Sequence, residues 1–202
     1  VGKYGSKICP VVVPSYEGEN LVGYVNLINK TAYSYDGVNE TKIDLPNNND
    51  VNNMFELLYE EIASQDEELM DKYFSGEELT PDDIIKGLKA GIMSGDLHPV
   101  FAGAGIDGQG IAVSLRAMTM VLPTADERSE TATDAADNAV ELKCDPSGPA
   151  AAIVFKTVAD PFIGKLSIFK VISGKISPSA KIINTRTDEE IRINKVVMLK
   201  GG

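Results

Sequence analysis

A short glycine-rich segment near the middle of the chain has the spacing most suggestive of chemistry. Gly103, Gly105 and Gly108 follow G-x-G-x-x-G between a predicted strand and a predicted helix. In dinucleotide-binding proteins this spacing lets the backbone approach a pyrophosphate at a helix N-terminus. Here the polar stretch 124–130 follows the helix, in place of a second strand ending in an acidic residue. The pattern favours a plain strand-to-helix connection, with a dinucleotide-binding enzyme as an alternative.

The rest of the chain offers few groups for catalysis or metal binding. His98 is the only histidine, which excludes a site that needs two imidazoles. Cys9 and Cys144 lie far apart and form neither a zinc motif nor a disulfide framework, so a reducing compartment is the simpler interpretation. No G-x-x-x-x-G-K-[ST] motif occurs, so the chain has no P-loop to cradle phosphates or position magnesium. We assign no catalytic residue and no metal ligand.

Acidic residues are concentrated in one stretch. Between positions 56 and 83 there are eleven acids and a single base, Lys72. Such a run is usually the solvated face of amphipathic helices. The alternative is a docking surface for a basic partner, because like charges on neighbouring helices repel unless they serve recognition. The acids are Glu56, Glu60, Glu61, Asp66, Glu67, Glu68, Asp71, Glu77, Glu78, Asp82 and Asp83.

Net charge is divided unevenly along the chain. Its 202 residues suit one large domain or two small ones, and 19 Lys+Arg against 30 Asp+Glu leave a net charge of −11. Residues 1–149 carry ten bases and 26 acids (−16), whereas residues 150–202 carry nine and four (+5). This excludes a chain-wide basic nucleic-acid binder. In the second part, Lys165, Lys170, Lys175 and Lys181 are either phosphate-facing or solubilising charges.

The elements expected before the glycine-rich segment are strands followed by helices. Residues 8–13, which contain Pro10, are expected to form an edge or interrupted strand, and 21–28 and 31–35 two further strands. Three short helices follow, capped by Asp50, by a box from Ser64 to Glu67, and by Thr80 with Pro81 in the first turn. Their apolar stripes are Met54, Leu57, Leu58 and Ile62; Leu69, Met70 and Tyr73; and Ile84, Ile85, Leu88 and Ile92.

The second half of the chain changes from mixed to β-rich. A strand at 99–102 precedes the glycine-rich segment, and a helix with Ile111, Leu115, Met118 and Leu122 in register ends at Pro123. Residues 124–149 are expected to be mainly a linker or an excursion between domains. Strands are predicted at 152–158, 166–172, 180–184 and 191–198, which suggests an incomplete small barrel or sandwich. No apolar run approaches the roughly 18 residues that span a bilayer, and both ends look cut, which predicts a piece of a longer protein.

Three segments, in matching order, resemble parts of one protein family. The run from His98 to Gly110 and its helix ending at Leu122-Pro123 looks like the last guanine-binding loop of translational GTPases of the elongation factor G type. Residues 155–174 are similar to the opening of that family's β-barrel domain two, and residues 66–79 resemble its inserted subdomain. Three ordered segments that cover nearly the whole chain are more specific than any one motif.

The resemblance implies a guanine contact at the glycine-rich segment. In the family this loop reads Gly-Ser-Ala, and a backbone N–H there bonds the guanine carbonyl oxygen. Gly103, Ala104 and Gly105 occupy the matching positions, so these residues are expected to contact the guanine of GTP. Ala104 in place of serine keeps the backbone donor and loses a hydroxyl, whereas Gly105 in place of alanine loosens the loop. The family's P-loop, switch regions and Asn-Lys-x-Asp motif are expected before Val1, so magnesium would be held only by parts absent from this chain, which alone is predicted to be an inactive GTPase.

The implied fold class is α/β plus all-β. Residues 1–126 would be the C-terminal part of a P-loop-type GTP-binding domain, with an inserted α+β subdomain at about 8–97. Residues 127–202 would be a linker and the N-terminal part of the translation-factor β-barrel domain two. An elongation factor G-like paralogue fits nearly as well as the housekeeping factor, and a standalone protein-interaction module is the second alternative.

The implied function is that of a cytoplasmic elongation factor, which couples GTP hydrolysis to ribosomal translocation. The implied partner is the ribosome, with the acidic helices docked on the stalk protein and the barrel on ribosomal RNA, and no membrane is expected. Neutralising Glu60, Glu61, Glu67 and Glu68 together is expected to weaken binding to the stalk.

Overall fold

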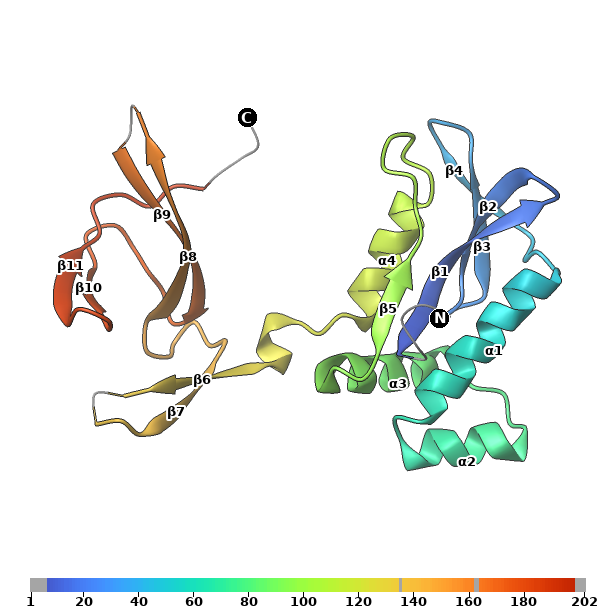
Figure 1. Ribbon diagram of the computed structural model, residues 1–202, viewed down its shortest axis with the longest axis horizontal. Coiled ribbons are helices and arrows are strands. Elements are labelled where there is room, and N and C mark those ends of the chain that lie inside the picture. The colour runs from blue at the N-terminus through green and yellow to red at the C-terminus, as the bar shows by residue number, and fades with distance from the viewer. Residues whose placement is uncertain (1–6, 135, 162–163, 199–202) are drawn as a thin grey trace. The chain divides into compact units, whose positions relative to one another are not determined.

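A computed structural model describes residues 7–134, 136–161 and 164–198 (Figure 1). The chain forms two compact units, Val1–Pro123 and Thr124–Gly202, called unit 1 and unit 2. The predicted glycine-rich segment and the acidic helices lie in unit 1, and the β-rich second half lies in unit 2.

Unit 1 is built on a five-stranded mixed sheet with strand order β4-β3-β2-β1-β5. Strands β1 to β4 form antiparallel pairs with their sequence neighbours. Strand β5 returns after three helices and lies parallel to β1, so the glycine-rich segment that follows β5 leaves from this side of the sheet. The strands are β1 (Ile8–Glu17), β2 (Asn20–Asn26), β3 (Thr31–Tyr35), β4 (Glu40–Ile43) and β5 (His98–Phe101).

Strand β1 is an interior strand whose register against β5 shifts between Pro10 and Val12, so of the two predicted forms, edge or interrupted, the interrupted one is found. Its prolines are tolerated because each lies where β1 has one paired neighbour. Pro10 is in register with Val100 of β5, in a stretch that precedes the first β2 pair at Val12. Pro14 is in register with Tyr24 of β2, beyond the last β5 pair, also at Val12. A proline has no N–H to donate to a neighbouring strand. Because β5 and β2 pair with different parts of β1, each proline interrupts the hydrogen bonds to one neighbouring strand only.

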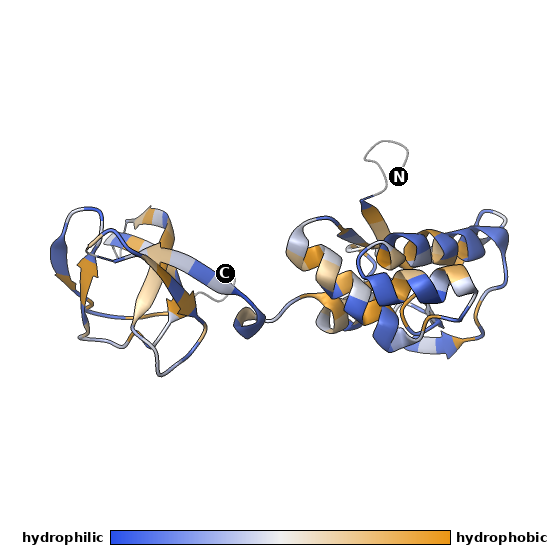
Figure 2. Ribbon diagram, turned by 90° about the horizontal axis from the view of Figure 1, so that it is seen from below, coloured by the Kyte–Doolittle hydropathy of each residue, from blue (hydrophilic) through white to orange (hydrophobic). Residues whose placement is uncertain are grey.

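Four helices complete unit 1, and the predicted helices all form. They are α1 (Asn49–Ala63), α2 (Glu67–Ser75), α3 (Pro81–Ser94) and α4 (Ile111–Val121). Apolar residues of the sheet and helices form one core, in which Leu58, Ile84 and Leu88 are fully buried. The helices of unit 1 alternate hydrophilic and hydrophobic positions, as amphipathic helices do (Figure 2). Of the predicted starts, Thr80 caps α3 in a capping box with Asp83, which confirms that signal.

The caps of the first two helices differ from the prediction. Asn48 caps α1, since its side chain accepts a 2.9 Å bond from the Val51 N–H, and Asp50 lies inside the first turn. Asp66 caps α2 by accepting bonds from the N–H groups of Glu68 and Leu69. Ser64 instead ends α1, so the predicted box from Ser64 to Glu67 does not form. Both loops contain more than one residue of a type that is preferred at the N-cap position, so the sequence does not single out the capping residue.

Helix α4 packs on the sheet with the opposite face from the one predicted. Val113, Ala117 and Val121 are buried, whereas Ile111 and Leu115 are 37% and 57% exposed. Because α4 is apolar nearly all round, its periodicity does not single out one face. The small residues face β1 and β2, where Ser114 Oγ also donates a 2.9 Å bond to the Ala102 carbonyl.

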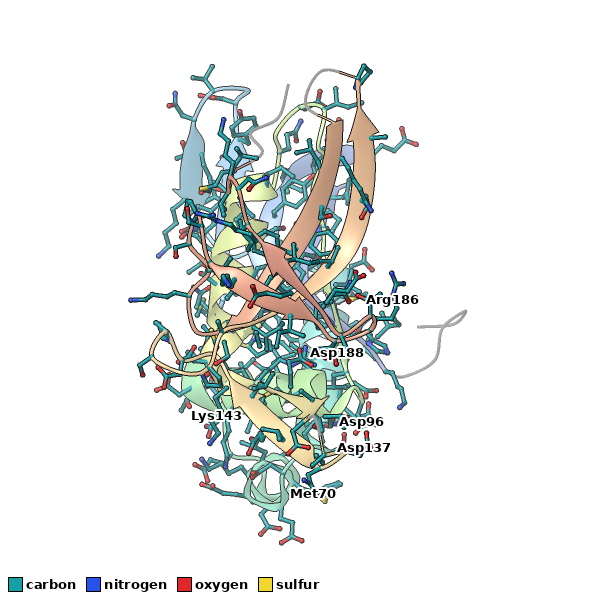
Figure 3. The ribbon with its side chains drawn as sticks, turned by 90° about the vertical axis from the view of Figure 1, so that its left-hand side faces the viewer. Met70, Asp96, Asp137, Lys143, Arg186 and Asp188 are labelled. Carbon is teal, nitrogen blue, oxygen red and sulfur yellow. The ribbon has the colours of Figure 1, made fainter. Side chains whose placement is uncertain are left out.

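In the described part of unit 2 there are three antiparallel two-stranded sheets: β6 (Ser129–Thr133) with β7 (Ala139–Lys143), β8 (Ala151–Asp160) with β9 (Gly164–Ser173), and β10 (Lys181–Asn184) with β11 (Glu189–Arg192). Residues 124–149 contain a short 3-10 helix, Ala125–Glu127, and the β6–β7 hairpin, so of the two predicted forms, linker or excursion, this stretch has the structure of an excursion. Figure 3 labels Asp137 in the hairpin turn and Lys143 at the end of β7. The last predicted strand is shorter than expected and ends at Arg192. Phe162 and Ile163, which belong to the segment 155–174, lie outside the described residues.

Candidate functional site

The glycine-rich segment, residues 103–110, forms a loop that is closed on itself between β5 and α4 and is called the glycine loop. The Ala104 N–H donates to the Gln109 carbonyl at 2.8 Å, and the Gly108 N–H donates to the Ala104 carbonyl at 2.9 Å. At its base, the Ala102 N–H donates to the Val12 carbonyl of β1 at 2.9 Å. The glycine loop is therefore bonded both internally and to the sheet.

Within the glycine loop, the three predicted guanine-contact residues differ in the state of their backbone donors. The Ala104 N–H, expected to be available, is used inside the loop. Among described residues no hydrogen-bond partner of the Gly105 N–H is found, and a Cβ at Gly105 would meet open space. Gly103 packs more tightly, since a Cβ there would lie 3.0 Å from Ile111 Cδ1. No hydrogen-bond partner of the Gly103 N–H is found among described residues either, so Gly103 and Gly105 can each offer a backbone donor, and Gly105 is the one with open space beside it.

Tyrosines of the sheet support the glycine loop from below, and the sequence analysis did not identify them. A Cβ added to Gly110 would lie 2.6 Å from Tyr24 Cδ1, and one added to Gly108 would lie 3.3 Å from Tyr35 Oη. Both glycines have positive φ, +76° at Gly108 and +72° at Gly110. The alternation of tyrosines on β2 and β3 was visible in the sequence, but nothing local connects it to a loop more than 70 residues away.

The topology around α4 differs from that of a dinucleotide-binding unit. In such a unit the helix is followed by a second parallel strand beside the first. Here α4 is followed by the 3-10 helix and β6, which pairs with β7 in unit 2. Among described residues, β5 is the last strand in the chain that joins the unit 1 sheet. This arrangement weighs against the dinucleotide-binding alternative.

The acidic helices divide their acids between structural pairs and free side chains. Lys86 Nζ lies 3.0 Å from both Asp66 Oδ2 and Glu68 Oε2, which joins α3 to α2. Lys30 pairs with Glu78. In contrast, no ion pair is found within the described part of the chain for Glu56 and Glu60 on α1 or for Glu67 and Asp71 on α2. Each of these two pairs has the i,i+4 spacing at which like charges repel.

Asp83 is the most firmly held acid of the acidic stretch. Its carboxylate lies 2.9 Å from Lys72 Nζ and accepts bonds from the Thr80 hydroxyl at 2.7 Å and the Thr80 N–H at 3.0 Å. The Lys72 ammonium and these two donors lower the pKa of Asp83 from 3.8 to about 2. This acid therefore stabilises the fold and is removed from the set that could meet a partner.

We expect Asp83→Asn to lower unit 1 stability by about 1–2 kcal/mol at neutral pH, because it removes an ion pair and one side of a capping box. The folded-state pKa lies below the unfolded value, so this stabilisation is complete above about pH 4 and is lost as the pH falls towards 2. Thermal unfolding from pH 2 to 7 should show wild type and variant converging at the acidic end. A constant difference across that range would contradict this account.

The lysines predicted to face phosphate are all exposed, and one of them is ion-paired. Lys165 and Lys170 lie five residues apart on β9, and the register of the β8–β9 ladder shifts between them, opposite Val154 and Lys156. Lys181 pairs with Glu190 at 2.6 Å across β10 and β11. All four lysines, including Lys175, are exposed. In unit 2 the solubilising interpretation therefore applies at least to Lys181.

The remaining candidate groups are separate from one another. Cys9 is buried in β1, and burial followed by the Glu61 charge raises the pKa of its thiol to about 12, whereas Cys144 is exposed. The exposed His98 begins β5, where its N–H donates to the Lys7 carbonyl at 2.8 Å. In the part of the chain that the structure describes, no three His, Cys, Asp or Glu side chains are grouped to hold a metal ion. Over the same residues, no helix combines the length and apolarity needed to cross a bilayer.

Comparison with known proteins finds one recurring similarity. No protein-family model matches the chain. The elongation factor G-like protein of Thermotoga maritima is 33% identical over 195 residues, which cover 96% of this chain and 28% of that protein. Elongation factor G of Ureaplasma urealyticum serovar 10 is 34% identical over 203 aligned residues, which cover 98% of this chain and 30% of that protein. The chain is similar to one part of elongation factor G over nearly its whole length.

The match to elongation factor G confirms the resemblance that three sequence segments indicated. The aligned residues run through both units, and the chain spans about three tenths of the length of these elongation factor G relatives. A crystal structure of a protein from Thermus thermophilus has a TM-score of 0.70, with 26% sequence identity, over 93% of this chain and 26% of that one. This structural similarity confirms that the fold is mixed α/β with many strands.

Proposed function

We propose that the chain is part of a cytoplasmic translation elongation factor that couples GTP binding and hydrolysis to ribosomal translocation. The observation that carries this proposal is the 33–34% identity to elongation factor G and an elongation factor G-like protein over nearly the whole chain. On this proposal, unit 1 is the C-terminal part of a P-loop-type GTP-binding domain with its inserted subdomain. Unit 2 is the beginning of the β-barrel domain two, which contacts ribosomal RNA.

The glycine loop would contribute the guanine contact. The Gly105 N–H fits this role, because it is free of bonds to described residues and the space beside Gly105 is open. A single N–H is suited to the carbonyl oxygen of guanine, an acceptor that adenine lacks. Gly103 and Ala104 would shape the loop. GTP supplies the reactive phosphoryl group when bound, and this chain has no P-loop sequence with which to hold its phosphates or magnesium.

The acidic helices would dock on a basic face of the ribosomal stalk protein. Helices α1 and α2 pack together, and each carries an i,i+4 pair of unpaired acids, Glu56 with Glu60 and Glu67 with Asp71. Such like-charge pairs cost stability by a few tenths of a kcal/mol each, and a basic partner would relieve that repulsion. Glu68 is ion-paired and Glu61 is half-buried, so Glu56 and Asp71 replace Glu61 and Glu68 of the predicted set.

We expect the quadruple variant Glu56→Gln, Glu60→Gln, Glu67→Gln and Asp71→Asn to weaken binding to ribosomes at least fivefold. The loss of four negative charges reduces attraction to a basic surface and leaves the fold intact, because no intramolecular pair is broken among the described residues. Binding of the 202-residue chain is measured by co-sedimentation at low and moderate salt, with intact ribosomes and with ribosomes stripped of the stalk protein.

The matched control is Asp126→Asn, Glu130→Gln, Asp137→Asn and Glu141→Gln, which makes the same charge change in unit 2. It should bind like wild type. Equal binding by the acidic-helix variant and wild type would contradict stalk docking. An equal loss of binding in both variants would show that the loss depends on the net charge of the chain and not on the acids of α1 and α2. No binding of wild type to intact ribosomes would count against the elongation factor assignment for this part of the protein.

A further inference from the structure

Three tyrosines lie on one face of the unit 1 sheet, beneath α4 and the glycine loop. Tyr24 of β2 and Tyr33 of β3 are cross-strand partners, and Tyr35 lies two residues beyond Tyr33 on the same strand face. Arg116 of α4 lies over the Tyr33 ring at 4.8 Å and pairs with Glu40 of β4. Helix α4 therefore covers Tyr33. Tyr24 and Tyr35, on the same face, lie next to the glycine loop that precedes α4.

Each of the other two tyrosines touches the glycine loop at a left-handed residue. Gly110 lies so close to the Tyr24 ring that three ring atoms are within 2.6–2.8 Å of where a Cβ would be. Gly108 lies against Tyr35, whose hydroxyl is held by donating a 3.0 Å bond to the Gly37 carbonyl. Tyr24 is only 6% exposed, so its ring is a fixed support. The two contacts flank Gln109, whose carbonyl accepts the Ala104 N–H that closes the loop.

The surroundings of Tyr24 agree with a close loop contact. Burial raises the pKa of Tyr24 above its ordinary value, and the nearby Tyr16 and then the Asp107 carboxylate of the loop add to this rise. On the helix side, Ser114 Oγ bonds the Ala102 carbonyl at 2.9 Å and the Ser114 N–H bonds the Gly110 carbonyl at 3.0 Å. The loop is thus fixed at its base and at the α4 end, while Gly105 lies on its open side.

We propose that Tyr24 and Tyr35 are positioning residues of the glycine loop. They hold Gly108 and Gly110 so that the Ala104–Gln109 closure persists and the Gly105 N–H stays available. The functional meaning of this role rests on the proposed guanine contact. Through Tyr24 and Tyr35, the proposed guanine contact is connected to strands β2 and β3. These strands adjoin β1, against which α1 packs.

The test is amide hydrogen exchange of the ¹⁵N-labelled chain without nucleotide. We expect Tyr35→Ala and Tyr24→Leu each to accelerate exchange of the Ala104 and Gly108 N–H groups at least tenfold, with the N–H groups of Ile84 and Leu88 in α3 unchanged within twofold. Tyr24→Phe keeps the ring that Gly110 approaches and should retain protection, whereas Tyr35→Phe removes the Oη that lies nearest Gly108 and should lose part of it. Tyr73→Ala, a half-buried tyrosine on α2, is the control for loss of an aromatic side chain elsewhere in unit 1.

Two outcomes overturn the positioning role: unchanged loop exchange in both truncations, or equal acceleration in the loop and in α3, which indicates global destabilisation. Should Tyr24→Leu fail to fold, the half-exposed Tyr35→Ala decides the matter alone. A separate titration with guanosine diphosphate, with adenosine diphosphate as control, follows the Gly105 amide shift. If wild type shows no guanine-selective shift, the proposed guanine contact is overturned, and the exchange result still decides the positioning role independently.

Discussion

Replacing Gly23 with alanine is expected to destabilise unit 1 by roughly 3 kcal/mol or more. A Cβ at this position would lie 2.5 Å from the Tyr33 carbonyl oxygen of β3 and 3.1 Å from Ile43 Cδ1. The nearer obstacle is backbone, so it cannot rotate away as a side chain would, and β2 and β3 would have to separate. Gly23 also lies beside an irregularity in the β1–β2 register, between Ser15 and Tyr16, where strand glycines are common.

The chain offers a direct way to measure this loss. All seven tyrosines lie in residues 1–123 and there is no tryptophan, so tyrosine fluorescence during urea unfolding reports on unit 1 alone. Gly37→Ala is the matched control, because Gly37 has φ +97° and nothing within 4 Å of its Cβ position. That variant should cost about 1 kcal/mol from backbone strain only. A Gly23→Ala loss no greater than that of Gly37→Ala would contradict the close approach of β2 and β3.

Replacing Gly110 with alanine is expected to cost about 2–3 kcal/mol and to open the glycine loop. The substitution forces a left-handed backbone on alanine, at φ +72°, and drives its Cβ into the Tyr24 ring. Because Gly110 is also the N-cap residue of α4, the displacement is transmitted to the first turn of that helix. The expected signature is a lower unfolding free energy together with faster exchange of the Ala104 and Gly108 N–H groups.

Gly105→Ala is the control within the same loop. Its Cβ would meet open space and its φ is outside the left-handed region, so its stability should stay within about 0.5 kcal/mol of wild type. It also retains the Gly105 N–H and should therefore keep any guanine-selective amide shift. If both alanine variants lose the same stability, the Tyr24 contact is not what constrains the loop.

Local signals in the sequence predicted the helices of unit 1 well, because their causes are local. The Thr80–Asp83 box and the apolar positions Ile84 and Leu88 lie within one or two turns of each other, so the start and buried face of α3 follow from neighbouring residues. For α4 the same reasoning chose the wrong face, since nearly every position is apolar. There the close approach of α4 to β1 and β2 decided that Val113, Ala117 and Val121 are buried.

Strand positions were harder to predict, because a strand's partners lie far away in the sequence. Pro10 correctly indicated an interruption in β1, but only the offset of β2 and β5 along β1 shows how an interior strand contains both Pro10 and Pro14. The β6–β7 hairpin was missed because β6 is polar and both strands are mostly exposed, so the short alternation of Val140 and Leu142 in β7 was a weak signal. The contact between Gly110 and Tyr24 depends on the register of β2 beneath α4, which no local pattern encodes.

The sequence by itself determined the family resemblance, the location of the glycine loop between strand and helix, the acidic stretch at 56–83 and the change to β structure after residue 149. These features depend on composition and on spacings of a few residues. Only the tertiary structure decided which acids are free, which N–H of the glycine loop is available, and which tyrosines support it. Those properties depend on contacts between residues far apart in the chain, such as Lys86 with Asp66 and Tyr24 with Gly110, and folding alone brings such residues together.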